Sequence, residues 1–212
     1  MTKETTPRGR GPQRTSRQDW IDAALEILIS EGVGHVKVLT LAEKLDCARS
    51  SFYWYFENRA DLLDSLLDYW QSTNTQAIVA QAQLPAETIN SALVNVFRCW
   101  VDTGLFDSRL DFAIREWARR SEAVRRALDF SDDARLEALA EMFARFGFAK
   151  GEAEVRARIV YFTQIGYYAL DVRETTEQRM ARAVDYLFCM TGQHPTAEEV
   201  SRLASNVEPA AR

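Results

Sequence analysis

Residues 41–63 read LAEKLDCARSSFYWYFENRADLL, and residues 52–56 within this stretch are five consecutive aromatic rings. On a helical wheel of about 100° per residue, Ala48, Phe52 and Phe56 share one side with Leu45. We expect this side to face a protein core. The core of a small helical unit cannot reach both sides of so short a helix, so the remaining rings need a different role.

The opposite side of this predicted helix combines polar and aromatic groups. Ser50 and Trp54 point away from the core side, Ser51 and Tyr53 flank them, and Arg49 lies beside Tyr53 at the helix start. Two interpretations fit this side equally well. The rings pack on another domain or protein, as aromatic residues do at interfaces. Alternatively, this is the recognition helix of a helix-turn-helix, whose hydroxyls bind phosphates and whose exposed ring contacts a thymine methyl group.

The preceding sequence predicts two further helices. Apolar residues repeat at helical spacing from about residue 16 until Gly32 and Gly34 end the helix. Leu41, Ala42 and Leu45 form a short second stripe, and a tight connection then leads into the ring-rich helix. Two short helices after a long one predict a compact three-helix unit.

The rest of the chain also predicts helices, so the expected fold class is all-α. The predicted helices begin with a long one from residue 58 or 59, followed by 87–103, 109–119, 122–146, 152–171 and 176–191, with a short one after Pro195. Nothing repeats at a fixed period, which argues against a solenoid. We predict a flexible basic arm at 1–16, a three-helix domain at 17–58 and a larger helical domain at 59–212.

Charge is distributed unevenly along the 212 residues. The net charge is −5, yet residues 1–59 contain nine Lys and Arg against eight Asp and Glu. The excess of basic residues is sharpest in the first seventeen residues, which hold five basic residues and one acidic residue. A polyanionic partner should therefore meet the N-terminal end. The arm is either inert or places its arginines in a neighbouring minor groove.

Composition argues against several other classes of protein. The three cysteines are far apart, which indicates neither a disulfide framework nor a metal site, and we expect a cytoplasmic protein without an export signal or a membrane span. The two histidines form no paired metal motif, and no glycine-rich phosphate loop or nucleophile elbow is present. We therefore expect no enzyme activity, no metal and no cofactor.

The stretch at 41–63 resembles the helix-turn-helix of the tetracycline-repressor (TetR) family of bacterial transcription regulators, and the resemblance extends over about residues 17–70. It implies an N-terminal DNA-binding domain. It implies that the buried positions are Leu41, Ala42, Leu45, Phe52 and Phe56. It also implies contacts with DNA bases or phosphates from Ser51, Tyr53, Trp54, Tyr55 and Arg59. The predicted DNA-binding set is completed by Thr40, Lys44, Arg49 and Ser50.

This chain departs from the family pattern at several positions. Asp46 stands where the family has glycine, at a turn that we expect to be left-handed, a conformation that Asp tolerates better than most residues. Ala48 replaces the usual serine or threonine cap, a loss of about 1 kcal/mol. Lys37 replaces a threonine ahead of the second helix, and Arg59 replaces a lysine. These changes are expected to shift operator preference and leave the family resemblance intact.

In the resembled family, the C-terminal domain binds a small effector and dimerises through its last two long helices. For an effector pocket we predict Trp70, Phe97, Trp100, Trp117, Phe143, Tyr161, Gln164 and Tyr168. For a dimer interface we predict Ile159, Phe162, Gly166, Ala169, Met180, Val184 and Leu187. The competing interpretation assigns the same rings and stripes to the core of a single chain.

These observations lead to one main hypothesis and two alternatives. The main hypothesis is a ligand-responsive regulator, in particular a repressor, that binds a palindromic operator in double-stranded DNA as a homodimer and is released by a small, largely apolar effector. The first alternative is a helical interaction module in which Tyr53 and Trp54 bind protein. The second and weaker alternative is a helical enzyme.

Overall fold

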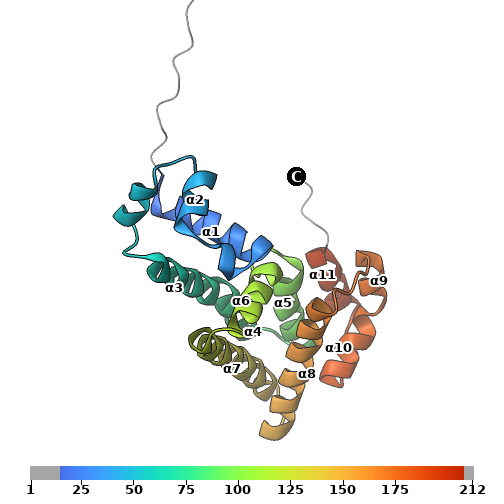
Figure 1. Cartoon of the computed structure of the whole chain (residues 1–212). Helices are drawn as coiled ribbons and strands as arrows, with labels where there is room; N and C mark the ends of the chain where they lie inside the picture. The colour runs from blue at the N-terminus through green and yellow to red at the C-terminus, as the bar shows by residue number, and fades with distance from the viewer. Residues whose placement is uncertain (1–14, 208–212) are drawn as a thin grey trace, which may run out of the picture. The chain divides into compact units, whose positions relative to one another are not determined.

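The computed structural model describes residues 15–207, and every regular element in that range is a helix, which confirms the predicted all-α fold (Figure 1). Most of the predicted basic arm, residues 1–14, lies outside the described residues. None of the described helices is long and apolar enough to cross a membrane. The chain divides into two compact units, one ending at Leu66 and the other beginning at Leu67.

The first unit is a small helical bundle. Its elements are α1 (Arg17–Glu31), the 3₁₀ helix η1 (Val33–His35), α2 (Val38–Lys44), the 3₁₀ helix η2 (Arg49–Trp54) and the first turns of α3 (Arg59–Trp70). Ser16 and Asp19 form a capping box that fixes the start of α1. Gly32 ends this helix at a φ of 84°, a conformation that glycine adopts without a steric cost. Leu62 and Leu66 of α3 are fully buried.

The ring-rich segment differs in one respect from the predicted helix. η2 is a six-residue 3₁₀ helix, and Ala48 before it has extended backbone and no side-chain cap. Ala48 is therefore exposed, and its predicted place on the core side is wrong. Asp46 has a φ of 48°, which confirms the expected left-handed turn.

The second unit contains the remaining elements. They are the π-helix η3 (Gln71–Thr75), α4 (Gln76–Gln83), α5 (Ile89–Val101), α6 (Ser108–Ala118), α7 (Glu122–Arg145), α8 (Lys150–Ala169), α9 (Thr176–Ala181), α10 (Ala183–Thr191) and α11 (Ala197–Val207). The long helices α7 and α8 pack against each other, α4 packs on α5 and α7, and α11 packs on α5 (Figure 1). Their buried faces form one apolar core.

Two of the predicted helices are interrupted. The helix predicted to run on from residue 59 contains the π-helical turn, which directs Asn74 and Thr75 into the protein. The helix predicted at 176–191 is broken at Arg182 into α9 and α10. The first interruption buries Asn74 and Thr75, and the second lies beside Arg179, Met180 and Ala183, which line a cavity.

Candidate functional site

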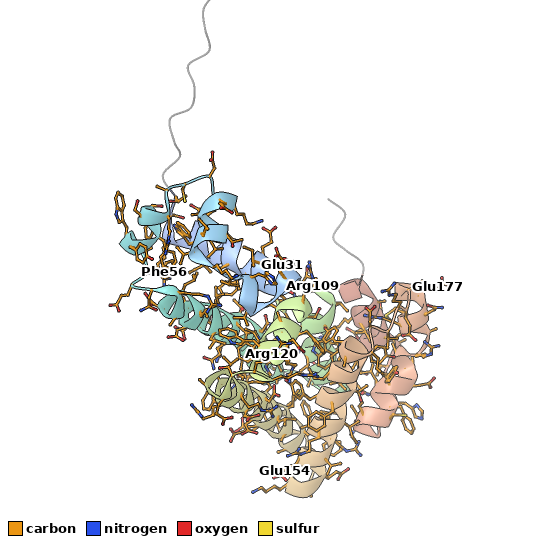
Figure 2. All side chains as sticks on the ribbon, in the orientation of Figure 1. Glu31, Phe56, Arg109, Arg120, Glu154 and Glu177 are labelled. Atoms are coloured by element: carbon orange, nitrogen blue, oxygen red, sulfur yellow. The ribbon has the colours of Figure 1, made fainter. Side chains whose placement is uncertain are left out.

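The rings of η2 divide between the core of the first unit and its surface. Phe52 is fully buried against Trp20, with 5.2 Å between the ring centroids, and it stacks on Phe56 (labelled in Figure 2) at the same distance. Tyr53 is 51% exposed and Trp54 is 72% exposed. Phe52 and Phe56 thus anchor the segment in the core, and Tyr53 and Trp54 are left exposed to solvent.

Polar groups surround the two exposed rings. Arg49 and Ser50 are both exposed, and the Arg49 guanidinium lies 3.5 Å from the Tyr53 hydroxyl. Arg49, Ser50, Tyr53 and Trp54 together are called the recognition surface below. Ser51 lies beside it, half-buried, and donates its hydroxyl to the Ala48 carbonyl at 2.7 Å. The surface offers a cation, hydroxyl groups and a flat apolar ring on one short helix.

The α2 residues of the predicted DNA-binding set lie at both ends of the polar face of that helix. Thr40 is half-buried, whereas Lys44 is exposed in the last turn. Lys44 pairs with Glu26 of α1 at 2.7 Å. Exposed pairs of this kind contribute only about 0–1 kcal/mol, so the ammonium group can exchange its partner for a phosphate.

Two other members of that set have partners within the first unit. The Tyr55 hydroxyl donates to the Thr15 carbonyl. The Arg59 guanidinium donates from Nε to the Val36 carbonyl at 2.5 Å and from Nη2 to the Val33 carbonyl at 2.6 Å. Both residues therefore fasten parts of the unit together. Sequence reasoning missed this role because the partners are backbone carbonyls far away in the chain.

The second unit contains a cavity of about 110 Å³. It lies among α5, α8, α9, α10 and α11. Its apolar lining consists of Phe97, Trp100, Val101, Val160, Met180, Ala183, Met190 and Leu203. Its polar lining consists of Thr163, Gln164, Tyr167, Arg179 and Tyr186.

The cavity includes three of the eight residues predicted for an effector pocket, namely Phe97, Trp100 and Gln164. The structure places the other five elsewhere: Trp70, Trp117, Phe143, Tyr161 and Tyr168. The sequence analysis missed Tyr167, Arg179 and Tyr186. The spacing of residues 160, 163, 164 and 167 marks one face of a helix, and it could have indicated Tyr167 as a cavity residue.

Two of the aromatic residues that lie outside the cavity, Trp70 and Tyr161, belong to a buried polar cluster. The Trp70 indole donates to Asp111 at 2.8 Å, and the Tyr161 hydroxyl donates to Asp132 at 2.7 Å. Arg135 is fully buried and pairs with Asp111 at 2.9 Å, while Arg115 joins Asp111 to Asp132. Both tryptophan and tyrosine bury their rings readily when the polar atom finds a partner, which explains their position.

The charges within this cluster set its ionisation state. Burial alone would raise the pKa of Asp111, but the guanidinium groups of Arg135 and Arg115 outweigh it and hold the pKa below its ordinary value of 3.8. Burial raises the pKa of Tyr161, which keeps its hydroxyl protonated. The cluster therefore holds Asp111 as a carboxylate between two arginines and joins α6, α7, α8 and the end of α3.

The residues predicted for a dimer interface fall into two groups. Ile159 is 45% exposed, Phe162 is 51% exposed, and Val184 on α10 is also exposed. Ala169 is exposed, and Gly166 is half-buried with nothing near a Cβ added there. Leu187, however, is fully buried in the core, and Met180 lines the cavity. The stripe on α8 that remains is apolar and exposed.

The first unit is similar in sequence to a known protein family. The model of a family described as bacterial regulatory proteins, tetR family, matches residues 21–66, which contain α2, η2 and the recognition surface. The first unit thus carries the N-terminal domain of the TetR family. The resemblance drawn from residues 41–63 is confirmed, and so is the helix-turn-helix with its larger helical domain.

Curated TetR-family relatives match only part of the chain. The HTH-type transcriptional regulator SrpR of Pseudomonas putida is 29% identical over 85 residues, which are 40% of this chain and 34% of SrpR. The tetracycline repressor protein class D of Escherichia coli is 40% identical over 53 residues, 25% of this chain and 24% of that protein. The chain thus spans about a third or less of the length of these two relatives.

Solved TetR-family structures match nearly the whole chain in fold. AmtR of Mycobacterium smegmatis aligns with a TM-score of 0.60 at 19% identity, covering 94% of this chain and 98% of AmtR. The fatty acid degradation regulator FadR of Bacillus halodurans aligns with a TM-score of 0.61 at 18% identity, covering 89% of this chain and all of FadR, 100%. At this level of identity the likeness shows the shared fold.

Proposed function

We propose that this TetR-family regulator is a repressor that binds a palindromic operator as a homodimer and is released by a small effector. The observation that carries the proposal is the recognition surface on η2. A guanidinium and hydroxyl groups are suited to phosphates and base edges, and an exposed ring such as Trp54 is suited to a thymine methyl group. Because DNA is the proposed partner, a cytoplasmic location is part of the same proposal.

The exposed stripe on α8 supports the homodimer. One short helix contacts only a few base pairs, and a second copy supplies the other half-site. Ile159 and Phe162 are large apolar residues that a solvent-exposed helix does not require. Gly166 leaves room for close approach of a second chain. We assign this stripe, with Val184 of α10, to the interface between two copies.

The cavity among α5, α8 and α10 is the proposed effector site. Effector binding releases DNA only if the effector prefers a state that fits the operator poorly. Helix α3 begins in the first unit and ends at Trp70, whose indole is bonded to the buried cluster. Tyr161 of that cluster adjoins Val160, a cavity residue of α8. We propose this chain of contacts as the link between the cavity and α3.

A selection experiment tests the proposal. The full chain is incubated with a pool of random-sequence duplexes, and bound duplexes are amplified and sequenced. We expect a palindrome to be enriched, with half-sites about 34–36 Å apart, one turn of DNA. If no sequence is enriched while Trp54 still mediates capture of a protein partner, the interaction-module alternative replaces the repressor proposal.

A further inference from the structure

The cavity in the second unit combines an apolar lining with a single charge. The rings of Phe97 and Trp100 lie 5.0 Å apart between centroids, and two methionines, Met180 and Met190, add polarisable sulfur atoms. Methionine sulfur and aromatic faces both favour contact with another aromatic ring. The lining thus suits a flat ring better than a branched aliphatic chain.

The volume of the cavity limits the size of that ring. At about 110 Å³, it is comparable with an engineered apolar cavity of about 150 Å³ that takes up benzene. Arg179, which contributes to the wall, is an exposed residue. A substituent that reaches Arg179 therefore extends towards solvent and needs little internal space. A single ring with one short substituent fits these limits.

Within the part of the chain that the structure describes, Arg179 is the one charged residue that lines the cavity. Its neighbours Arg173 and Arg182 are paired with Asp171 at 2.7 Å and with Glu174 at 2.5 Å, whereas Arg179 joins no ion pair within residues 15–207. Its guanidinium lies over the ring of Tyr167, 5.8 Å from the centroid. A guanidinium held in this way presents a planar pair of donors that matches a carboxylate.

Two tyrosines add a hydroxyl donor at the same cavity. The hydroxyl oxygens of Tyr167 and Tyr186 are 2.6 Å apart, so one donates to the other and the second keeps a proton to donate elsewhere. The hydrogen bond with Tyr186 raises the pKa of Tyr167 to about 12, so the Tyr167 hydroxyl is protonated at neutral pH. Among the described residues, no carboxylate lines the cavity to receive a cation. Because Arg179 and the two tyrosines offer hydrogen-bond donors and a positive charge, the cavity favours an anionic ligand.

We propose that the ligand of this cavity is a single-ring aromatic carboxylate, with its ring among Phe97, Trp100 and the methionines and its carboxylate on Arg179 and the tyrosine pair. This inference names the chemical class of the effector, and it rests on the proposed function only for the consequence that binding releases DNA. The binding itself is a separate, measurable property.

Calorimetry on the full chain tests the class of ligand. The probes are benzoate, its uncharged analogue benzamide, and the cation benzylammonium. We expect benzoate to bind at least about tenfold more tightly than either analogue, since hydrogen bonds to a charged partner are the strong ones. The variant Arg179→Gln should lose this preference. The variant Arg179→Lys keeps the positive charge but not the planar pair of donors, so it should retain part of the preference. Arg173→Gln, outside the cavity, is the matched control and should behave as the wild type.

Several outcomes overturn the inference. They are no detectable binding of benzoate at millimolar concentration, equal binding of benzoate and benzamide, or an unchanged preference in Arg179→Gln with a wild-type melting temperature. Operator binding is measured separately on the same samples. DNA binding without benzoate binding refutes only the ligand class, whereas Arg179-dependent benzoate binding without any DNA binding refutes only the proposed repressor.

Discussion

Trp54 shows how one residue carries the proposed DNA contact without contributing to the fold. Its ring is 72% exposed, so Trp54→Ala should change the free energy of unfolding by less than about 0.5 kcal/mol. The same substitution should weaken operator binding by about tenfold or more, because a base contact is worth about 1–3 kcal/mol. Thermal unfolding and fluorescence anisotropy with the selected duplex measure the two effects.

Phe130 provides a matched control for this prediction. It lies on α7 in the second unit and is also 72% exposed. Phe130→Ala removes an equally exposed ring and should leave operator affinity unchanged. Equal losses of affinity in both variants would show that Trp54 acts only through general surface properties.

Arg59 is expected to behave in the opposite way to Trp54. Its two bonds to the Val33 and Val36 carbonyls are lost in Arg59→Ala, which should lower the free energy of unfolding by about 1.5–3 kcal/mol. Arg49→Ala, at the exposed recognition surface, should weaken DNA binding and leave stability near that of the wild type. Urea unfolding monitored by circular dichroism distinguishes the two arginines. A fully stable Arg59→Ala would contradict the fastening role assigned to this residue.

At the scale of helices, the buried cluster joins α6 to α7 through Asp111 and Arg135. Because the folded protein holds the pKa of Asp111 below its ordinary 3.8, the carboxylate stabilises the fold above that pH. This contribution is lost as the pH falls below 3.8 through the lowered pKa. We therefore expect the wild type to lose stability steeply in this acid range.

The variant Asp111→Asn isolates this effect. It leaves Arg135 buried without its charge partner, which should cost about 3–5 kcal/mol at neutral pH. Its stability should then depend less on pH in the acid range than that of the wild type. Asp133→Asn, an exposed change on α7, is the control. Parallel pH profiles for Asp111→Asn and the wild type, measured by urea unfolding, would contradict the assignment.

The elements also show which features the sequence could predict. Helix positions and the division of the rings in η2 followed from local spacing, because apolar periodicity and caps are properties of neighbouring residues. The π-helical turn did not, because Asn74 exchanges hydrogen bonds with the Asp107 backbone and Thr75 binds Arg135. The role of Arg59 and the position of Arg179 at the cavity likewise depend on residues distant in the chain. Tertiary contacts decided these features, and no local pattern encodes them.

At the scale of the whole molecule, the exposed stripe on α8 predicts a dimer. Phe162 is 51% exposed within one chain, so Phe162→Glu should leave the single chain folded. A charge placed in an apolar interface between copies should convert the dimer to a monomer and weaken operator binding by about tenfold or more. Sedimentation velocity measures the oligomeric state. Phe130→Glu is the control, and a dimer that persists in Phe162→Glu would contradict this interface.

The central claim is that two copies recognise one specific DNA sequence. The most direct measurement is a titration of the wild-type chain with the selected palindrome and with a scrambled duplex of equal length, repeated over a series of salt concentrations. We predict that the palindrome binds at least about 10³-fold more tightly at physiological salt, and that affinity for both duplexes falls steeply as salt rises. Equal affinity for the two duplexes, or affinity that does not respond to salt, would contradict the account.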